Sequence, residues 1–369
     1  MLNYLKKISV FHFHFMLSSM LFSQNLDLKI EYITTSQGLS HNGAYLIQQD
    51  HKGFLWIGTE DGLNRYDGSS IKVYRHDPDD PNSLSNNIVR LPIVDQNGVL
   101  WFGTFGGGLN QYDVENDAFI RYQHDPDNPH SLSNDIIRSM YEDQAGTIWV
   151  GTIGGLNKLN PESKQFTRYM HDPGDPSSLR DNVVLSIFED STGAFWIGTK
   201  NGLNRFDPST EQFIQYGQDP GDPTSPSHKE VRSIREDGSG TLWMGTDLGL
   251  CKLSAERTRF TCYQHDAKDP RTLSSNSVIA VHVDQTDEIW VGTWGGGLNR
   301  FGRNTESFIR YEHHPADPYG LSSNNVDRIY EDPQGMLWLS TDAGANMLDS
   351  RGKSFSHYRA MPDNPEALS

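Results

Sequence analysis

Residues 132–178 read LSNDIIRSMYEDQAGTIWVGTIGGLNKLNPESKQFTRYMHDPGDPSS, and this stretch decides the fold. It contains four short runs rich in β-branched and aromatic residues, at 134–142, 147–152, 156–160 and 166–170. Asp-x-x-Gly and Gly-Gly separate the first three runs, and these residues favour tight turns. None of the runs shows the periodicity of an amphipathic helix. The stretch therefore predicts a meander of four antiparallel strands.

The same outline recurs seven times along the chain. Its marker is Trp-x-Gly-Thr or a close variant, with tryptophans 45 to 48 residues apart at Trp56, Trp101, Trp149, Trp196, Trp243, Trp290 and Trp338. Four strands in a period of this length are typical of a propeller blade, whereas solenoids need amphipathic helices or one strand per turn. We predict an all-β fold, a seven-bladed β-propeller of four-stranded antiparallel blades, over residues 24–369. Blade repeats start near residues 40, 85, 133, 180, 227, 274 and 322.

Residues 1–23 are predicted to be a signal peptide. A pair of lysines precedes a mostly apolar stretch, and Ser23 is a small residue suited to the cleavage point. The apolar stretch is too short to cross a bilayer comfortably. An uncleaved anchor or a misassigned start is the alternative, because His12 and His14 interrupt the apolar stretch. The remaining chain is expected to be exported to the periplasm.

Strand order assigns the loops to two faces. In a four-stranded meander, the loop between strands two and three lies at the same end as the loop that leads from strand four to the next blade. The long Asp-Pro-rich loops and the Gly-Thr-x-Gly loops therefore share one face, called the long-loop face here. The short Asp-x-x-Gly turns and the loops between strands three and four share the other, the turn face. Long, variable loops favour the long-loop face as the place of recognition.

The repeats also carry a longer pattern, D-x-x-G-x-[LI]-W-[IV]-G-T-x-x-G-L-N-[RK]-[YFL]. It occurs at 50–66 and 143–159 and, with Phe195 before its tryptophan, at 190–206. This pattern, and the repeat opening Gly-Leu-Ser-His-Asn at 38–42, resemble the two-component regulator propeller family. The resemblance covers essentially the whole mature chain. It implies the periplasmic input part of a hybrid sensor kinase, a class that commonly senses fragments of polysaccharide.

The end of this chain departs from the fuller members of that family. In those, a second propeller, a β-sandwich, a membrane helix and kinase domains follow. The glycine runs at 106–108 and 295–297 lie between β runs, so they are predicted turns rather than phosphate-binding loops. The last two residues, Leu368 and Ser369, repeat the start of a blade. We therefore expect a chain truncated before any kinase domain and without enzymatic activity, whereas a full-length relative would be a sensor histidine kinase.

No catalytic residues, metal ligands or cofactors are predicted. The turn aspartates, such as Asp95 and Asp143, resemble the Asp-box of sialidase propellers, which is a structural turn. No carboxylate pair departs from the repeat as a glycosidase would require. The loops that begin like His76-Asp77-Pro78 do not have the spacing of a calcium loop, although a weak calcium site is the alternative to a turn. A formal net charge of −17 argues against nucleic acid as a partner.

A ligand site must come from positions where the repeats differ. Five residues before each turn aspartate, the copies carry Tyr45, Arg90, Arg138, Leu185, Arg232, Ile279 and Asp327. The arginines are expected to ring the central funnel, where guanidinium groups suit carboxylate or sulfate groups of an acidic sugar. In the loops between strands two and three, Phe105 and Trp294 offer aromatic faces to sugar rings. The predicted ligand-binding residues are Tyr45, Arg90, Phe105, Arg138, Arg232, Trp294 and Asp327. The alternative is that they are unrelated residues of the rim.

Ring closure has two candidate strands. Residues 29–34 and 354–359 both resemble a fourth strand, which gives eight such strands for seven blades. We expect residues 29–34 to pair with the last blade, because a ring closed by strands from both termini resists opening. In the alternative, residues 354–359 close the ring.

The only two cysteines, Cys251 and Cys262, fall in blade five. They take the places that Asn204 and Gln215 hold in strands three and four of the previous blade. A hairpin loop centred near residues 256 and 257 puts the cysteines opposite each other, close to disulfide reach. They are therefore a disulfide candidate in an oxidising compartment. Two buried free thiols are the alternative.

The sequence as a whole predicts a periplasmic sensory or ligand-binding propeller of a two-component system that senses an oligosaccharide. Its expected partners are the oligosaccharide, downstream sensor kinase domains or a partner protein, and a second copy in a homodimer. One alternative is a structural propeller that docks a protein through the same face. An extracellular polysaccharide lyase or hydrolase is a further alternative, which the missing catalytic set disfavours.

Overall fold

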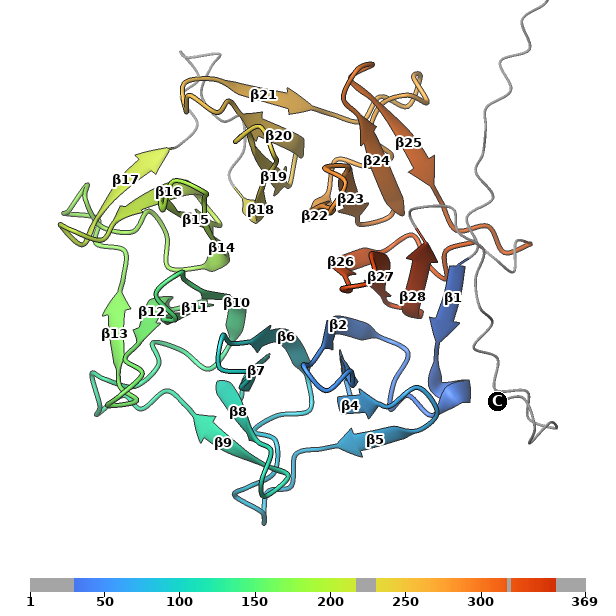
Figure 1. Cartoon of the computed structure of the whole chain (residues 1–369). Helices are drawn as coiled ribbons and strands as arrows, with labels where there is room; N and C mark the ends of the chain where they lie inside the picture. Colours follow the sequence, from blue (N-terminus) through green and yellow to red (C-terminus); the bar gives the residue numbers. More distant parts are fainter. Residues whose placement is uncertain (1–29, 217–229, 317–319, 350–369) are drawn as a thin grey trace, which may run out of the picture.

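The computed structural model of the chain describes residues 30–216, 230–316 and 320–349. Seven four-stranded antiparallel sheets stand around a common axis, which confirms the predicted seven-bladed β-propeller (Figure 1). Strand one of each blade lies at the centre of the ring, and strand four lies at the rim. No described residue belongs to a helix long and apolar enough to span a membrane. The predicted signal peptide lies outside the described residues.

The first three blades follow one another along the chain. Blade one consists of β2 (Ala44–Gln49), β3 (Leu55–Thr59), β4 (Gly62–Tyr66) and β5 (Ile71–Tyr74). Blade two consists of β6 (Val89–Val94), β7 (Leu100–Thr104), β8 (Leu109–Asp113) and β9 (Ala118–Tyr122). Blade three consists of β10 (Ile137–Glu142), β11 (Ile148–Thr152), β12 (Gly155–Leu159) and β13 (Phe166–Tyr169). Strand one of blade three starts three residues later than predicted, because the Asn134 side chain accepts a hydrogen bond from the Ile136 backbone (2.9 Å) and forms a turn.

The other four blades repeat this order. Blade four consists of β14 (Val184–Glu189), β15 (Phe195–Thr199), β16 (Gly202–Asp207) and β17 (Gln212–Tyr216). Blade five consists of β18 (Val231–Glu236), β19 (Leu242–Thr246), β20 (Gly249–Leu253) and β21 (Phe260–Tyr263). Blade six consists of β22 (Val278–Val283), β23 (Ile289–Thr293), β24 (Leu298–Gly302) and β25 (Ser307–Tyr311). Blade seven consists of β26 (Val326–Glu331), β27 (Met336–Thr341), β28 (Gly344–Asp349) and β1 (Ile30–Ile33).

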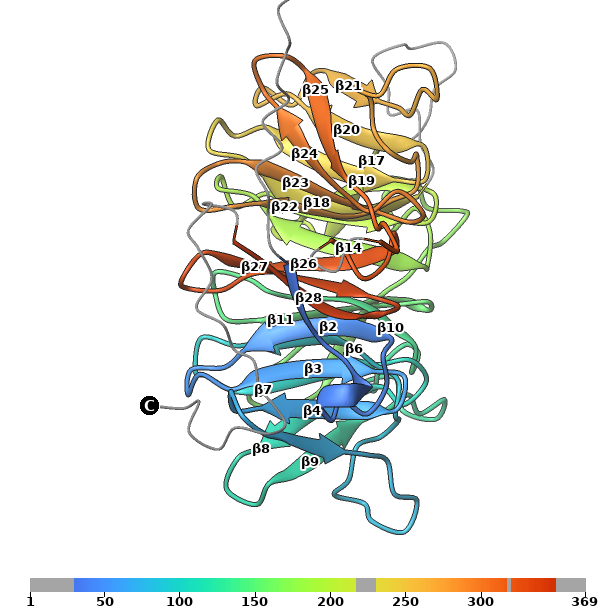
Figure 2. The same cartoon turned by 90° about the vertical axis from the view of Figure 1, so that its right-hand side faces the viewer.

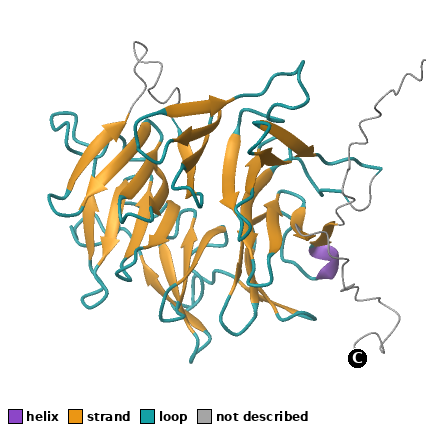
Figure 3. Cartoon of the chain, turned by 45° about the horizontal axis from the view of Figure 1, so that its top comes forward, coloured by secondary structure: helices purple, strands orange, loops and turns teal. Residues whose placement is uncertain are grey.

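The first described strand completes the last blade. β1 pairs with β28 in antiparallel register, from Ile30 opposite Leu348 to Ile33 opposite Ala345. Figure 2 shows β1 lying against β28 at the junction of blades seven and one, called the seam here. The short helix η1 (Thr35–Gln37) follows β1 and is drawn in purple in Figure 3. The predicted closure by the N-terminal strand is confirmed, and residues 354–359 lie outside the described residues.

Neighbouring blades approach closely at the glycine of the Trp-x-Gly-Thr motif. A Cβ added to Gly292 of blade six would lie 2.9 Å from Cγ1 of Val326 in blade seven. Blade seven has Ser340 in place of this glycine, and the residue that blade one presents at the equivalent place is the smaller Ala44. Both side chains are fully buried. The pair of changes keeps the blade spacing at the seam, because Ala44 leaves the room that the serine takes.

The long loops are held by strands three and four of the blade that they enter. In blade two, the Asn110 side chain accepts a hydrogen bond from the Ser85 backbone (2.9 Å), and the Arg121 guanidinium donates to the carbonyls of Ser83 (2.8 Å) and Asp80 (2.7 Å). The same pairs are Asn157 with Arg168 in blade three and Asn299 with Arg310 in blade six. The long-loop face is therefore built on tethered loops rather than on freely projecting ones.

An aspartate and a tryptophan join the turn of each blade to its core. In blade six, Oδ1 of Asp284 accepts hydrogen bonds from the backbones of Thr286 (2.9 Å) and Glu288 (3.0 Å), and Oδ2 accepts one from Nε1 of Trp290 (2.8 Å). All seven blades repeat the indole bond, at 2.8 to 3.0 Å. Burial alone would raise the pKa of Asp190 and Asp237, but these bonds and an arginine hold each pKa at about 2.

Replacing Asp284 by Asn tests this joint. Asparagine keeps an oxygen for the two backbone donors, but its amide nitrogen cannot accept the buried indole N–H of Trp290. We expect the unpaired donor to cost about 1–3 kcal/mol and to lower the midpoint of urea unfolding, followed by tryptophan fluorescence. Asp207→Asn is the control, since Asp207 accepts bonds from Ser209 and Thr210 in an exposed turn rather than from a buried indole. An equal loss in both variants would contradict the role of the indole bond.

Candidate functional site

The first strand of every blade carries a β-bulge near the long-loop face. In blade two the ladder with β7 passes from Val89 to Leu91 and leaves Arg90 without a partner. The bulged residues of the seven blades are Tyr45, Arg90, Arg138, Leu185, Arg232, Ile279 and Asp327. All seven keep part of their surface exposed, although they lie on the innermost strands. A bulge turns its side chain away from the sheet, so we infer that these residues are directed toward the propeller axis. The region around the axis that the seven first strands surround is called the axial channel here.

Tyr45, Arg90 and Phe105 form a cluster where blades one and two meet. The guanidinium carbon of Arg90 lies 4.2 Å from the ring centroid of Tyr45 and 4.8 Å from that of Phe105. At these distances the cation is attracted to both aromatic faces. Burial, and a hydrogen bond that the Tyr45 hydroxyl donates to Glu60, raise the pKa of Tyr45 to about 12. Nε of Arg90 is buried without a hydrogen-bond partner among the described residues, so the guanidinium keeps an unused donor.

Arg232 and Arg138 border the channel from blades five and three. Arg232 donates to the Glu230 carboxylate through Nε (3.0 Å) and Nη2 (2.7 Å), and to the Ser277 hydroxyl through Nη1 (3.0 Å). Burial lowers the pKa of Arg138, the charges of Arg90 and Arg232 lower it further, and Glu230 opposes them. The three arginines therefore share one electrostatic environment, in which Glu230 is already the partner of Arg232.

Asp327 is the acidic member of the bulge positions. Burial raises the pKa of Asp327 to about 6, against the opposing charges of Arg328 and Arg90 and with a further rise from Asp342. Asp342 itself accepts a hydrogen bond from the Asn325 side chain (2.7 Å). Asp327 therefore changes its charge between pH 5 and pH 7, at the edge of an arginine cluster.

Exposed apolar side chains stand on the loops between strands two and three. Trp294 is 50% exposed, Leu248 42% and Ile153 37%. The backbone N–H of Trp294 donates to the carbonyl of Ser277 (2.9 Å), whose hydroxyl accepts from Arg232. Trp294 and Arg232 are thus attached to the same residue. The long-loop end of the channel combines charged walls with an apolar rim.

The structure places the predicted ligand residues in two groups at this end. Tyr45, Arg90, Phe105 and Asp327 gather where blades seven, one and two meet, and Arg232 and Trp294 lie at blades five and six. Arg138 stands between them and interacts by charge with Arg90 and Arg232. Sequence reasoning missed the channel residues Glu230, Arg235 and Arg328. The signal for Arg328 was available, since the other blades place Leu, Ser or Ala there.

The histidines of the long loops serve the loops themselves. Nδ1 of His76 lies 2.6 Å from the carbonyl oxygen of Leu84, and His124 repeats the contact with Leu132 (2.6 Å). Within the described ranges, no three His, Cys, Asp or Glu side chains are placed to hold a metal ion. Two open grooves of about 320 and 540 Å³ lie at the rim, between the outer strands of blades five and six and of blades one and two. Neither groove includes a predicted ligand residue.

Five segments of the chain match the family model of the two component regulator propeller, at residues 38–61, 131–154, 178–201, 225–247 and 320–343. The chain is a two-component regulator propeller. The matched segments cover strands one and two in blades one, three, four, five and seven of this regulator propeller. In the other two blades the loop between strands two and three is one residue longer.

The regulator propeller is similar to parts of larger proteins. It is 43% identical over 77 residues to Histidine kinase P4 of Formosa agariphila, a match that covers 21% of this chain and 6% of the kinase. Its structure is similar to the extracellular domain of a protein described as a hybrid two-component system of B. thetaiotaomicron, with a TM-score of 0.75 and 25% identity. That match covers 87% of this chain and 42% of the other. The chain thus spans less than half the length of these relatives, and it is related to extracellular domains of hybrid two-component systems.

An enzyme shares the fold of the regulator propeller. Virginiamycin B lyase of Staphylococcus aureus matches with a TM-score of 0.62 over 87% of this chain and 98% of its own. The two sequences are 15% identical. At this identity the similarity shows a common fold and carries no activity to this chain.

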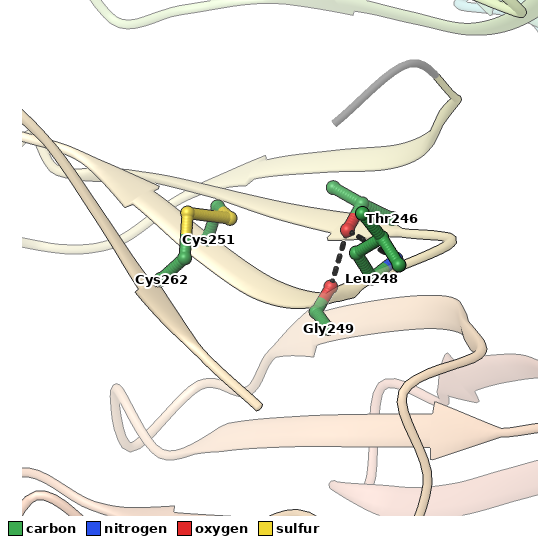
Figure 4. The surroundings of a disulfide bond; sticks show 5 residues. All are labelled: Thr246, Leu248, Gly249, Cys251 and Cys262. Carbon is green, nitrogen blue, oxygen red and sulfur yellow. Dashed lines mark hydrogen bonds between the residues drawn. A yellow bond between two sulfur atoms is a disulfide. The ribbon is translucent and has the colours of Figure 1, made fainter. Parts of the chain in front are cut away.

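The two cysteines of the regulator propeller face each other across β20 and β21. Their sulfur atoms are 2.09 Å apart and their Cα atoms 4.1 Å apart (Figure 4). They occupy the register positions at which blade two places Asn110 and Arg121, the residues that hold the incoming long loop. The loop that enters blade five also departs in sequence, with Pro226 where the other loops have leucine. A covalent link between strands three and four therefore stands where other blades have the loop anchor.

We expect the exported protein to contain this disulfide. Alkylation without reductant, followed by mass spectrometry, should leave both cysteines unlabelled, whereas labelling of both would contradict the bond. The Cys251→Ala, Cys262→Ala double variant should lose no more than about 2–3 kcal/mol of stability, because the bridge closes only a short loop. The variant should keep the secondary structure of the propeller by circular dichroism.

Proposed function

We propose that this propeller is an exported sensory module that binds an acidic oligosaccharide at the long-loop end of its axial channel. The observation that carries the proposal is the convergence of Arg90, Arg138 and Arg232, on bulges of three different blades, in one electrostatic environment. The relation to extracellular domains of hybrid two-component systems supports a sensory role outside the cytoplasm. Ligand binding would then be signalled to sensor kinase domains, which belong either to the same polypeptide or to a partner protein.

The charge distribution favours an anionic ligand at this place. The chain as a whole has a formal net charge of −17, so its overall field does not attract anions. The channel end is different, because neither Arg90 nor Arg138 makes an ion pair among the described residues, and their charges repel each other. A carboxylate or sulfate group placed between them would accept charge-assisted hydrogen bonds, each stronger than a neutral one. Anion binding here relieves the repulsion among the arginines.

The apolar rim supports a sugar as the carrier of that anion. Trp294 exposes half of its surface beside the Arg232 and Ser277 pair, and Phe105 packs against Arg90. Pyranose rings have apolar faces that stack on aromatic side chains, while their carboxylate or sulfate groups reach sideways. A uronate or sulfated oligosaccharide can therefore contact both the arginines and the apolar rim. A neutral oligosaccharide can contact only the apolar rim.

Calorimetry against uronate and sulfated oligosaccharides tests the proposal. We expect binding to the acidic panel, weakened at least about tenfold by Arg138→Ala, since loss of one charge-assisted contact costs about 1.5–3 kcal/mol. Trp294→Ala should weaken binding of the same ligands. The matched controls are Leu185→Ala and Ile153→Ala, which truncate the equivalent positions of blades four and three and should leave the affinity unchanged.

Two outcomes would contradict this function. If the folded protein binds neither acidic nor neutral oligosaccharides, the same face would instead serve a protein partner. If the protein releases reducing ends from a polysaccharide panel, it is a glycan-degrading enzyme rather than a sensor.

The pH dependence of binding should follow Asp327. The pKa of this carboxyl is raised to about 6, so the group is charged at pH 7 and mostly neutral at pH 5. Its negative charge repels an acidic ligand, and we expect tighter binding at pH 5 than at pH 7. Asp327→Asn should bind at pH 7 as the unchanged protein does at pH 5, and should show no such dependence. Weaker binding at pH 5 in the unchanged protein would overturn the assignment.

A further inference from the structure

Two further arginines, Arg328 and Arg235, follow the bulge positions of their strands in the direction of the turn face. Arg328 follows the bulge residue Asp327 in β26, and Arg235 lies three residues beyond the bulge residue Arg232 in β18. A strand rises about 3.3 Å per residue, which places Arg235 roughly 10 Å further toward the turn face than Arg232. Both arginines are partly exposed residues of innermost strands. Both break the repeat, since blade one has Leu46 and Gln48 at their respective positions.

These two side chains meet other charges across the axis rather than along the ring. Arg328 of blade seven interacts electrostatically with Arg235 of blade five, Arg138 of blade three and Arg90 of blade two. Blades this far apart on the ring come together only at the centre. Burial, together with the charge of Arg235, lowers the pKa of Arg328 to about 10, and the charge of Asp327 opposes this shift. The centre of the channel is therefore strongly positive.

The acidic side chains at the turn end of the first strands already accept hydrogen bonds from other groups. Glu142, Glu189, Glu236 and Glu331 each accept a hydrogen bond from a backbone N–H in the turn of the preceding blade, at 2.6 to 3.0 Å. Glu236 also accepts from Arg257 (3.0 Å), and Glu331 lies 3.3 Å from Nε2 of His282. Burial and the charge of Arg235 lower the pKa of His282 to about 4, so this ring is neutral and adds no charge.

Neither of the deeper arginines consequently makes an ion pair with a described carboxylate, and Asp327 is the one acidic group that acts on Arg328. Arg235 donates one hydrogen bond, to the carbonyl of Ile234 (2.7 Å), and Arg328 makes no ion pair in the described part of the chain. Asp327, with a pKa of about 6, is charged at pH 7, but this one carboxylate faces the charges of both Arg328 and Arg90. A guanidinium does not lose its proton, and an uncompensated buried charge costs several kcal/mol. An anion on the axis would remove this cost.

We propose that Arg235 and Arg328 hold an oxyanion on the propeller axis, below the arginines of the long-loop end. Two planar guanidinium groups from different blades match the several acceptor oxygens of a sulfate or phosphate group. The group is either a free inorganic anion or the sulfate or carboxylate at the end of a bound oligosaccharide. Only the second source rests on the proposed function, and the two are separated by experiment.

Inorganic sulfate is the first probe. We expect sodium sulfate to raise the thermal midpoint of the protein in a saturable way, at concentrations up to about 10 mM, below those at which sulfate stabilises proteins generally. Sodium chloride at equal ionic strength should not reproduce the rise. An equal effect of chloride would overturn the proposal, because it would indicate screening rather than a site.

Arg328→Ser is the decisive variant, because serine already occupies this position in three blades as Ser139, Ser186 and Ser233. Without sulfate, the variant should melt at or above the midpoint of the unchanged protein, since a repelling charge is gone. Its half-saturating sulfate concentration should rise at least about tenfold. Arg271→Ser, which removes an exposed arginine paired with Asp269, should respond to sulfate as the unchanged protein does.

A sulfate response that Arg328→Ser leaves intact would overturn the site. Should this variant fail to fold, Arg235→Gln takes its place, since glutamine occupies that position in blade one as Gln48. The same loss of the sulfate response is expected, and its persistence would equally overturn the site.

Competition between inorganic sulfate and a sulfated oligosaccharide shows which of the two supplies the oxyanion. If a sulfated oligosaccharide displaces inorganic sulfate in calorimetry, its own sulfate group occupies the axis. If the oligosaccharide binds without displacing sulfate, the site belongs to the free anion. Arg138→Ala should weaken the oligosaccharide and preserve the sulfate response, so failure of the oligosaccharide site and failure of the oxyanion site give different results.

Discussion

The bond between the turn aspartate and the tryptophan indole is the interaction on which the rest of the propeller depends. A tryptophan packed between two sheets needs an acceptor for its indole N–H. Oδ2 of an aspartate such as Asp284 meets that need, while Oδ1 of the same carboxylate closes the turn between strands one and two. Local turn geometry and blade packing are thereby set by one side chain, and each blade can repeat the solution independently.

Because the blades are built alike, the positions at which they differ point to the chemistry of the site. Because the Asp–Trp joint, the close-packed glycine and the loop anchor recur, the first strands are placed alike around the axis. The bulge then presents one variable side chain per blade to the channel at an equivalent height. Chemistry at the axis is changed by single substitutions that leave the scaffold intact. Such substitutions are the three arginines Arg90, Arg138 and Arg232 and the acidic residue Asp327.

Repetition explains how much could be predicted from the sequence. Alignment of seven copies located the strands of blade three within a residue, apart from the start of strand one at Ile137, where the Asn134 turn intervenes. It also located the positions that prove to be bulges, since those vary among copies. The change of residue type at Arg328 is visible in the alignment, but the sequence does not show that Arg328 and Arg235 meet across the axis. Nor does it show that Glu236 and Glu331 are engaged by neighbouring blades.

Closure of the ring by β1 has a consequence for the order of folding. Ile30 pairs with Leu348, more than 300 residues later in the chain, so this is the most non-local strand pairing among the described residues. The loop-closure entropy of this pairing opposes its formation, whereas every other described strand pairs with a neighbour in sequence. β1 therefore precedes every other described strand in the chain and pairs only when the last blade has been made. Until then β1 and the outer edge of β28 are both unpaired strand edges, which are prone to pair with other chains.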